Sequence, residues 1–286
     1  MQPEIKTLPV KDFPPLLGEI PDAPETLYYR GTLPNWDQKF LCVVGSRKYS
    51  SYGKEACEQL ISGLAGYPIV IVSGLALGID SIAHKAALSA GLKTIAVPGS
   101  GLDWKVLYPA AHLNLAKQII QSGGTLLSEF EADFRATPYS FPQRNRIMAG
   151  LSNAVLVIEA EQKSGTLITS RLATEYNRDV LALPGSIFSQ GSAGPHMLIK
   201  LGATPVTSPQ DILNVLGFKE EKTGTKRDYS NCTPAEQTIL ELLAQPMPKD
   251  ELIRASGLTT SEANTTLSVL EIKGLIKETM GEVRLT

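Results

Sequence analysis

Six short apolar runs in the middle of the chain constrain its fold more than any other feature of the sequence. Each is rich in β-branched and aliphatic residues and is followed by a helix-compatible stretch. The runs are FLCVVGSR (40–47), IVIVSG (69–74), KTIAVPG (93–99), GTLLSE (124–129), NAVLVIEA (153–160) and DVLALPG (179–185). Such alternation is typical of a parallel sheet with crossover helices, and nearly continuous apolar character indicates strands buried on both faces. We therefore predict an α/β fold, an extended Rossmann-like domain with a mostly parallel sheet, over residues 40–217.

The segments on either side of this domain differ from it in composition. Residues 1–39 are rich in proline, and we predict an extended N-terminal arm packed on the main domain. Residues 218–230 are mostly charged or polar and contain Gly224, a composition that predicts an exposed linker. A domain boundary is therefore expected in this linker.

Residues 231–286 have the pattern of a small C-terminal winged-helix domain. Thr233 followed by Pro234 is typical of a helix N-cap with proline at the first helical position. Two short strand-like pieces about a turn at Gly281 follow the helical part. The predicted helices cover residues 234–243, 249–255 and 261–273.

Charge and cysteine content exclude several classes of protein. The net charge of −2 argues against a protein that coats nucleic acid through bulk electrostatics, so any DNA site must be a local patch. Three cysteines without CxxC spacing, Cys42, Cys57 and Cys232, predict neither a disulfide framework nor a zinc site. The longest apolar stretch, residues 69–79, is shorter than the roughly 18 residues of a membrane span, so we expect a soluble, cytoplasmic protein.

Four loops at the ends of the predicted strands carry residues suited to binding anions. Glycine allows close backbone approach, exposed N–H groups and hydroxyls donate hydrogen bonds, arginine pairs with phosphate, and an aromatic ring stacks on a base. Because the carboxyl ends of parallel strands meet at one edge of the sheet, these loops are expected to converge. The candidates are Gly45, Ser46 and Arg47; Ser73 and Gly74; Phe141, Arg144, Asn145 and Arg146; and Lys163, Ser164, Gly165 and Thr166.

Some of these residues have an equally simple structural interpretation. The pair Arg144 and Arg146 suits either contact with a nucleic-acid strand or the pairing of arginines with carboxylates, and the sequence leaves both open. Asp80 and His84 stand four residues apart on one predicted helical face, where an Asp–His pair more often anchors a helix than catalyses a reaction.

No recognisable catalytic set, cofactor motif or metal site occurs in the sequence. In PGSGLDW, Trp104 occupies the third glycine position of a dinucleotide-binding motif, and no P-loop is present. The histidines His84, His112 and His196 lack the spacing of metal ligands. We therefore predict a binding protein with no cofactor and no metal, and no enzyme activity.

Eight motifs follow one another between residues 45 and 203 of the chain. They are GSR, SGLALGIDSIAH, PGSGLDWKVLYP, LLSEF, FPQRNRIMAGLS, VIEAEQKSGTLIT, LALPG and GPHMLIKLGA. In this order they resemble the DprA/Smf family of DNA-processing proteins. The preceding PPLLGEIPDAPETLYYRGTL (14–33) resembles the lead-in to that family's first strand, and residues 231–286 resemble its winged-helix domain more loosely.

The resemblance implies a function that the residues alone do not specify. It implies a homodimer that binds single-stranded DNA without catalysis, protects it and loads the recombinase RecA during natural transformation. It places phosphates at Ser46, Arg47 and the Lys163–Gly165 loop. It also places the dimer and RecA-facing surface at His196, Leu198, Ile199 and Leu201.

The chain departs from the family pattern in two respects. A helical domain that often precedes the lead-in is not seen in this sequence. The expected recognition helix, residues 261–273, carries Glu262 and Glu271 with a single basic residue, which suits a DNA major groove poorly. We therefore expect residues 231–286 to act in protein contacts.

Two alternatives remain open from the sequence. Similar folds serve phosphoribohydrolases with a GGxGTxxE motif, which is absent here, although Glu129 and Glu159 remain candidate acids. The other alternative is a nucleotide sensor whose pocket binds a small phosphorylated ligand and controls the winged-helix domain.

Overall fold

The computed structural model describes residues 3–218, 232–243, 245–279 and 281–285. The chain divides into two compact units, Met1–Glu220 and Glu221–Thr286, each with its own hydrophobic core. The predicted linker, residues 218–230, lies outside the described residues except for Phe218. Among the helices of the described ranges, none has both the length and the apolar character needed to cross a membrane.

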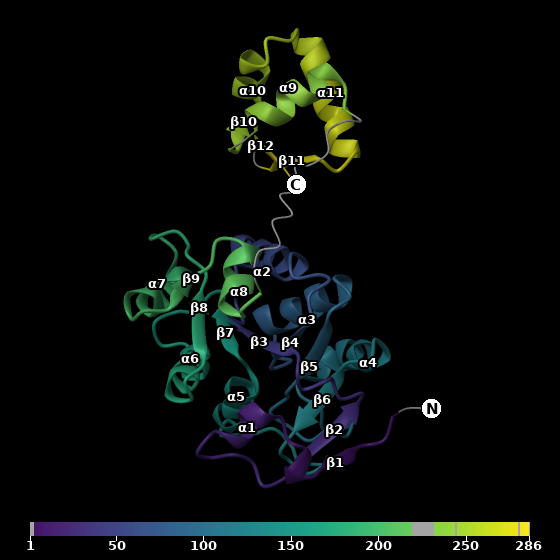
Figure 1. Ribbon diagram of the computed structural model, residues 1–286, viewed down its shortest axis with the longest axis vertical. Coiled ribbons are helices and arrows are strands. Elements are labelled where there is room, and N and C mark those ends of the chain that lie inside the picture. Colours follow the sequence, from purple (N-terminus) through teal and green to yellow (C-terminus); the bar gives the residue numbers. More distant parts are fainter. Residues whose placement is uncertain (1–2, 219–231, 244, 280, 286) are drawn as a thin grey trace. The chain divides into compact units, whose positions relative to one another are not determined.

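The first unit is built on a nine-stranded, mostly parallel sheet (Figure 1). Its strand order is β1-β2-β6-β5-β4-β3-β7-β8-β9, and every neighbouring pair from β6 to β9 is parallel. This confirms the predicted fold class. The strands are β1 (Lys6–Leu8), β2 (Leu27–Gly31), β3 (Lys39–Val44), β4 (Ile69–Ser73), β5 (Lys93–Ala96), β6 (Thr125–Ser128), β7 (Ala154–Val157), β8 (Asp179–Ala182) and β9 (Thr204–Pro205).

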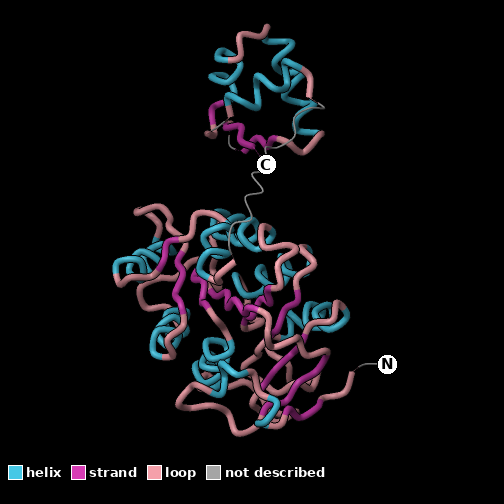
Figure 2. Tube along the Cα trace, in the orientation of Figure 1, coloured by secondary structure: helices cyan, strands magenta, loops and turns pink. Residues whose placement is uncertain are grey.

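Helices cover both faces of this sheet. On one face lie α2 (Ser51–Ser62), α3 (Ile79–Ser89), α4 (Leu113–Gln121) and α8 (Pro209–Val215). On the other lie α1 (Pro15–Gly18), α5 (Ser140–Leu151), α6 (Thr166–Glu175) and α7 (Ala193–Lys200). Three single-turn 3₁₀ helices lie at Val10–Asp12, Ala110–His112 and Gln190–Ser192. Figure 2 shows the strands running between these helices.

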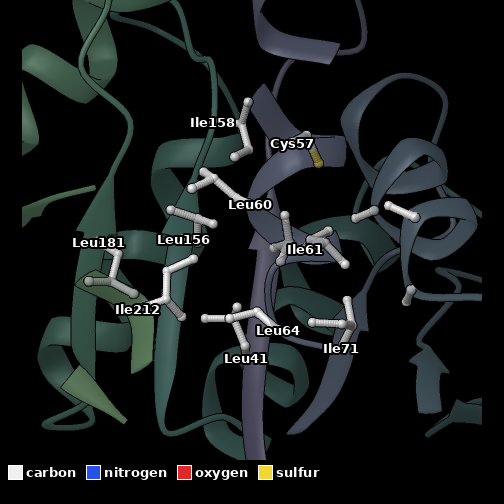
Figure 3. Close-up of a cluster of buried hydrophobic side chains, with 14 of the residues drawn as sticks. Leu41, Cys57, Leu60, Ile61, Leu64, Ile71, Leu156, Ile158, Leu181 and Ile212 are labelled. Atoms are coloured by element: carbon white, nitrogen blue, oxygen red, sulfur yellow. The ribbon is translucent and has the colours of Figure 1, made fainter. Parts of the chain in front are cut away.

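The buried strands supply side chains to two cores at once, because successive residues of a strand point to opposite faces. In β3, Leu41 and Val43 pack under α2, α3 and α8, while Phe40, Cys42 and Val44 pack under α5 and α6. Figure 3 shows the first of these clusters, in which Leu41 meets side chains from α2, β7 and α8. The nearly continuous apolar runs of the sequence are the direct signature of this arrangement.

The order of the strands reverses direction at β3. From β3 the chain adds β4, β5 and β6 on one side and then crosses back to add β7, β8 and β9 on the other. The carboxyl ends of β3 and β7 therefore lie next to each other, and the connections that follow these two strands run to opposite sides of the sheet. In open α/β sheets such a switch point leaves a crevice where ligands bind.

The N-terminal segment is more structured than the sequence suggested. β1 pairs with β2, and β2 pairs antiparallel with β6, so both strands extend the sheet at one edge. Leu8, Leu17 and Leu27 from this segment are buried in cores of the unit. Residues 1–39 were expected to form an extended arm, and their contribution to the sheet was not anticipated.

The second unit has the helices and hairpin expected of a winged-helix fold. Thr233 and Thr259 each cap a helix in a reciprocal capping box, and Gly281 joins the two hairpin strands with a positive φ of 82°. Its elements are α9 (Pro234–Leu242), β10 (Met247–Pro248), α10 (Lys249–Ala255), α11 (Thr260–Ile272), β11 (Ile276–Thr279) and β12 (Glu282–Leu285).

Candidate functional site

A cavity of about 410 Å³ opens at the switch point of the sheet. Its walls come from the loops after β3 and β7, from the start of α6 and from one face of α5. Four basic side chains line it against two acidic ones, Asp80 and Glu161. Ten of the predicted residues meet in this cavity: Gly45, Ser46, Arg47, Phe141, Arg144, Asn145, Lys163, Ser164, Gly165 and Thr166.

The loop after β3 holds Arg47 exposed at the rim of this cavity. The Ser46 hydroxyl closes the turn, since it donates to the Lys48 carbonyl (2.7 Å) and accepts from the Lys48 N–H (3.0 Å). The Ser46 carbonyl accepts the N–H of Ile79 at the start of α3 (3.2 Å). The turn is thereby fixed at both ends, while the guanidinium of Arg47 stays accessible to solvent.

The loop after β7 brings Lys163 to the cavity from the neighbouring strand. The Thr166 hydroxyl donates to the Gly45 carbonyl (3.1 Å), which ties the start of α6 to the β3 loop. The Ser164 hydroxyl accepts the Thr166 N–H (3.2 Å), and Lys163 itself is exposed. Two flexible cations, Arg47 and Lys163, therefore stand on two loops that are hydrogen-bonded to each other.

Residues of α5 form the third side of the cavity. The guanidinium carbon of Arg47 lies 5.6 Å from the ring centroid of Phe141, within the range of a cation–π contact. Asn145 lies one turn further along the helix and also lines the cavity. The site thus combines positive charge with an aromatic ring, the two features that a nucleic-acid strand requires.

Arg144 and Asp80 form the floor of the site, and both are buried. Arg144 donates to the Val97 carbonyl, whereas its Nε has no hydrogen-bond partner among the described atoms. Burial lowers the pKa of Arg144 and raises the pKa of Asp80, and each group's charge counteracts the shift of the other. Asp80 accepts the N–H groups of Gly74 (3.1 Å) and Ala76 (3.4 Å). Asp80 therefore shapes the loop after β4 and does not present a free base.

Three predicted residues are not brought into the main cavity. Ser73 is fully buried, and its hydroxyl donates to the Val43 carbonyl (2.7 Å). Gly74 turns its N–H towards Asp80, so neither residue offers a donor to the cavity. Arg146 points elsewhere and forms ion pairs with Glu129 and with Asp22 (3.6 Å). For Arg146 the structure therefore shows the carboxylate pairing that the sequence left open.

Lys48 and Glu161 line the cavity although sequence reasoning did not select them. Lys48 directly follows the predicted Gly45–Arg47 loop, so its place in the sequence could have predicted that it lines the cavity. Glu161, two residues before Lys163 in the sequence, places a negative charge on the rim. The net positive character of the site is consequently modest.

The two candidate acids of an enzyme are engaged in structural contacts. Both oxygens of the buried Glu159 accept hydrogen bonds from Ser50, from its N–H (2.9 Å) and its hydroxyl (2.5 Å), at the N-cap of α2. Glu129 is paired with Arg146. Neither carboxylate lines the cavity at the switch point.

The histidines occupy separate places in the fold. His84 lies buried with Nδ1 2.7 Å from the Thr94 hydroxyl, and His112 Nδ1 lies 2.7 Å from the Leu75 carbonyl. In the parts of the chain that the structure describes, no group of three potential ligands is arranged to hold a metal ion.

Comparison with known proteins assigns the chain to a family. The family model described as DNA recombination-mediator protein A matches residues 4–217, and the model of the DprA winged helix domain matches residues 224–282. The chain belongs to the DprA/Smf family. The resemblance inferred from the eight motifs is thereby confirmed, together with the function class of a DNA-processing recombination mediator.

The relatives cover most of the chain. Protein Smf of Escherichia coli is 41% identical over 277 residues, which span 94% of this chain and 74% of that protein. DNA processing protein DprA of Streptococcus pneumoniae is 48% identical over 202 residues, 71% of this chain and 70% of that protein.

Two solved structures share the fold. The crystal structure of the Streptococcus pneumoniae protein matches with a TM-score of 0.68 and 45% identity over 74% of each chain. A structure of DNA processing protein A from Helicobacter pylori, described as revealing a unique single-stranded DNA binding mode of that protein, matches with a TM-score of 0.67. Its identity is 33%, and the match covers 76% of this chain and 98% of that one.

The residues expected at the dimer and RecA-facing surface of a DprA/Smf protein divide between interior and exterior. Leu198 is buried and Ile199 is partly buried against the core. The His196 ring lies 3.0 Å from the Gly185 carbonyl. Leu201, at the end of α7, is 77% exposed. Of these four residues, Leu201 is the one whose side chain is largely available for contact.

Proposed function

We propose that this protein binds single-stranded DNA at the switch-point cavity without catalysing a reaction on it. In this proposal it protects incoming strands and loads RecA onto them during natural transformation. The related Helicobacter pylori protein, 33% identical, is described as binding single-stranded DNA, which supports the choice of ligand.

The observation that carries the proposal is the placement of Arg47 and Lys163. They stand exposed on two loops, after β3 and β7, that the Thr166–Gly45 hydrogen bond ties together beside one cavity. Two such cations can contact successive phosphates of a flexible strand, while Phe141 offers a ring to a base. Binding is therefore expected to be independent of the DNA sequence, because these groups contact the phosphate backbone and the faces of the bases.

The arrangement of the acids supports binding without chemistry. Glu129 and Glu159 are held by Arg146 and Ser50, and Asp80 accepts two backbone N–H groups. A general base must reach the proton that it abstracts, and these contacts direct the carboxylates of Glu129, Glu159 and Asp80 towards the protein itself. The remaining acid of the cavity, Glu161, lies exposed on its rim.

We further propose that the protein acts as a homodimer in the cytoplasm and contacts RecA through the surface around α7. Leu201 is exposed there, and Ile187 and Phe188 before α7 are 81% and 93% exposed. Large apolar side chains exposed to this degree suit a protein–protein contact. The winged-helix unit is proposed to serve protein contacts as well.

The test is binding of oligo-dT of about 20 bases by Arg47→Ala and Lys163→Ala variants across a series of salt concentrations. Each variant is expected to lose about tenfold in affinity at low salt, because one charge-assisted phosphate contact is removed. Each is also expected to reduce the slope of log affinity against log salt by about 0.7.

Lys85→Ala is the matched control. Lys85 is exposed on α3 and does not line the cavity, so removing its charge should leave both affinity and slope unchanged. If Arg47→Ala and Lys163→Ala bind as the control does, the proposed site is wrong.

A further inference from the structure

Next to the cavity at the switch point lies a small notch, which shares Arg47 with it. Arg47, Ala76, Phe141 and Arg144 line both spaces, and the notch is completed by Gly74, Leu77, Tyr108 and Pro109. Tyr108 belongs to the PGSGLDWKVLYP motif that follows β5. The proposed function described above makes no use of this residue.

Two aromatic rings stand side by side next to the guanidinium of Arg47. The ring centroids of Tyr108 and Phe141 are 5.4 Å apart and their planes are inclined by 51°. The guanidinium carbon of Arg47 lies 5.6 Å from the Phe141 centroid. A positive charge and two rings therefore follow one another along the surface.

The Tyr108 side chain is exposed although its backbone is anchored. The Tyr108 N–H donates to the hydroxyl of the buried Ser100 (3.0 Å), and its neighbours Leu107 and Pro109 are buried. Tyr108 is 45% exposed, and Leu77, which also lines the notch, is 49% exposed. An aromatic ring held on a fixed backbone at a solvent-facing rim loses little conformational freedom when a ligand covers it.

We propose that Tyr108 and Leu77 form a second subsite, which stacks a base of the nucleotide adjacent to the one whose phosphate contacts Arg47. This inference rests on the proposed function and defines the ligand further. The notch encloses only about 20 Å³, too little for a base to enter, so the base lies over the tyrosine ring. Stacking of this kind tolerates every base, because every base has a π-face.

The second subsite would distinguish a strand from a mononucleotide as the ligand of this site. A mononucleotide can contact either the cavity or the face of Tyr108, whereas consecutive nucleotides of a strand contact both. Part of the affinity for a strand should therefore depend on its bases and on Tyr108, in addition to the phosphate contacts of Arg47 and Lys163.

The experiment compares binding of oligo-dT with binding of an abasic deoxyribose-phosphate oligomer of the same length at one salt concentration. Tyr108→Ala is expected to lose about tenfold in affinity for oligo-dT and to bind the abasic oligomer as the unaltered protein does. Tyr108→Leu, which retains apolar bulk beside Phe141, should show the same loss, and Tyr108→Phe should retain the affinity.

Tyr52→Ala is the matched control, since Tyr52 is 49% exposed on α2 and lines neither space. It should bind both oligomers normally. The inference is overturned if Tyr108→Ala and Tyr108→Leu bind oligo-dT as tightly as the unaltered protein does, or if their affinity falls equally for oligo-dT and for the abasic oligomer. It is also overturned if Tyr108→Phe loses as much affinity for oligo-dT as Tyr108→Ala does. Failure of the unaltered protein to bind oligo-dT would instead refute the proposed function itself.

Discussion

His84 illustrates how one buried residue of this fold responds to pH. It belongs to α3 and is fully buried, and the Thr94 hydroxyl, which donates to the Ile71 carbonyl (2.8 Å), is left to accept from the Nδ1–H. Burial, with smaller contributions in the same direction from His112 and Arg144, lowers the pKa of His84 to about 3. The imidazole is therefore neutral in the folded protein at neutral pH.

Acid should destabilise the protein through this residue. Between the unfolded pKa of about 6.5 and the folded pKa of about 3, the unfolded chain binds a proton that the folded chain does not, so the unfolding free energy falls as pH falls. From pH 7 to pH 5 the loss from His84 is about 2 kcal/mol. Urea denaturation at pH 7 and at pH 5 measures the unfolding free energy of each protein at the two pH values. In the His84→Gln variant, the difference between the two free energies should be smaller by about 2 kcal/mol than in the unaltered protein. A difference of the same size in both proteins would contradict this role of His84.

At the scale of residues, the sequence predicted the chemistry of the site better than the direction of each side chain. Arg47 and Lys163 could be predicted because they follow strand ends, whose common edge is fixed by the topology. Arg144 and Arg146 could not be told apart, because residues two apart on a helix point to nearly opposite sides and the helix orientation was unknown. Arg144 faces the cavity, and Arg146 faces Glu129.

At the scale of elements, the approach of α3 to the β3 loop depends on one glycine. Gly78 has φ 87° and ψ −134°, a conformation open essentially to glycine alone. A Cβ at this position would lie 2.6 Å from the Arg47 Cα and would also collide with the Ser46 carbonyl. The rim of the cavity can therefore lie against the start of α3 only because residue 78 has no side chain.

Gly66 provides a matched comparison, because its φ is 84° and a Cβ there would meet no atom within 4 Å. Gly66→Ala should cost about 1 kcal/mol from backbone strain and leave oligo-dT binding unchanged. Gly78→Ala should cost about 2–4 kcal/mol and weaken binding about tenfold, because the added Cβ displaces Arg47. Urea denaturation and binding at fixed salt measure both effects. Equal behaviour of the two variants would show that the close contact at Gly78 does not matter.

The elements themselves were predictable wherever their signals were local. The six apolar runs became strands β3 to β8, and Thr233-Pro234 did begin a helix. β1 and β2 were missed because they lie at the edge of the sheet among prolines, and the pairing of β2 with β6 joins residues about 100 positions apart. Pairing over such a distance leaves no local pattern in the sequence.

At the scale of the whole molecule, the two units differ in how well they suit DNA. In the winged-helix unit, Lys273 at the end of α11 is paired with the buried carboxylate of Glu236 (2.7 Å), and Glu262 closes the capping box at the other end. Residues 231–286 contain five basic and eight acidic side chains. The cationic cavity of the first unit is therefore the better candidate for binding a strand.

The central claim is that a single strand binds at the edge of the parallel sheet and not at the winged helix. Equilibrium binding of oligo-dT and of a duplex of equal length, at fixed salt, should be measured for the intact chain and for residues 1–218. We predict that both proteins prefer the single strand and that their affinities for it agree within about threefold. A tenfold loss in the shortened chain, or a preference of the intact chain for duplex, would contradict the account.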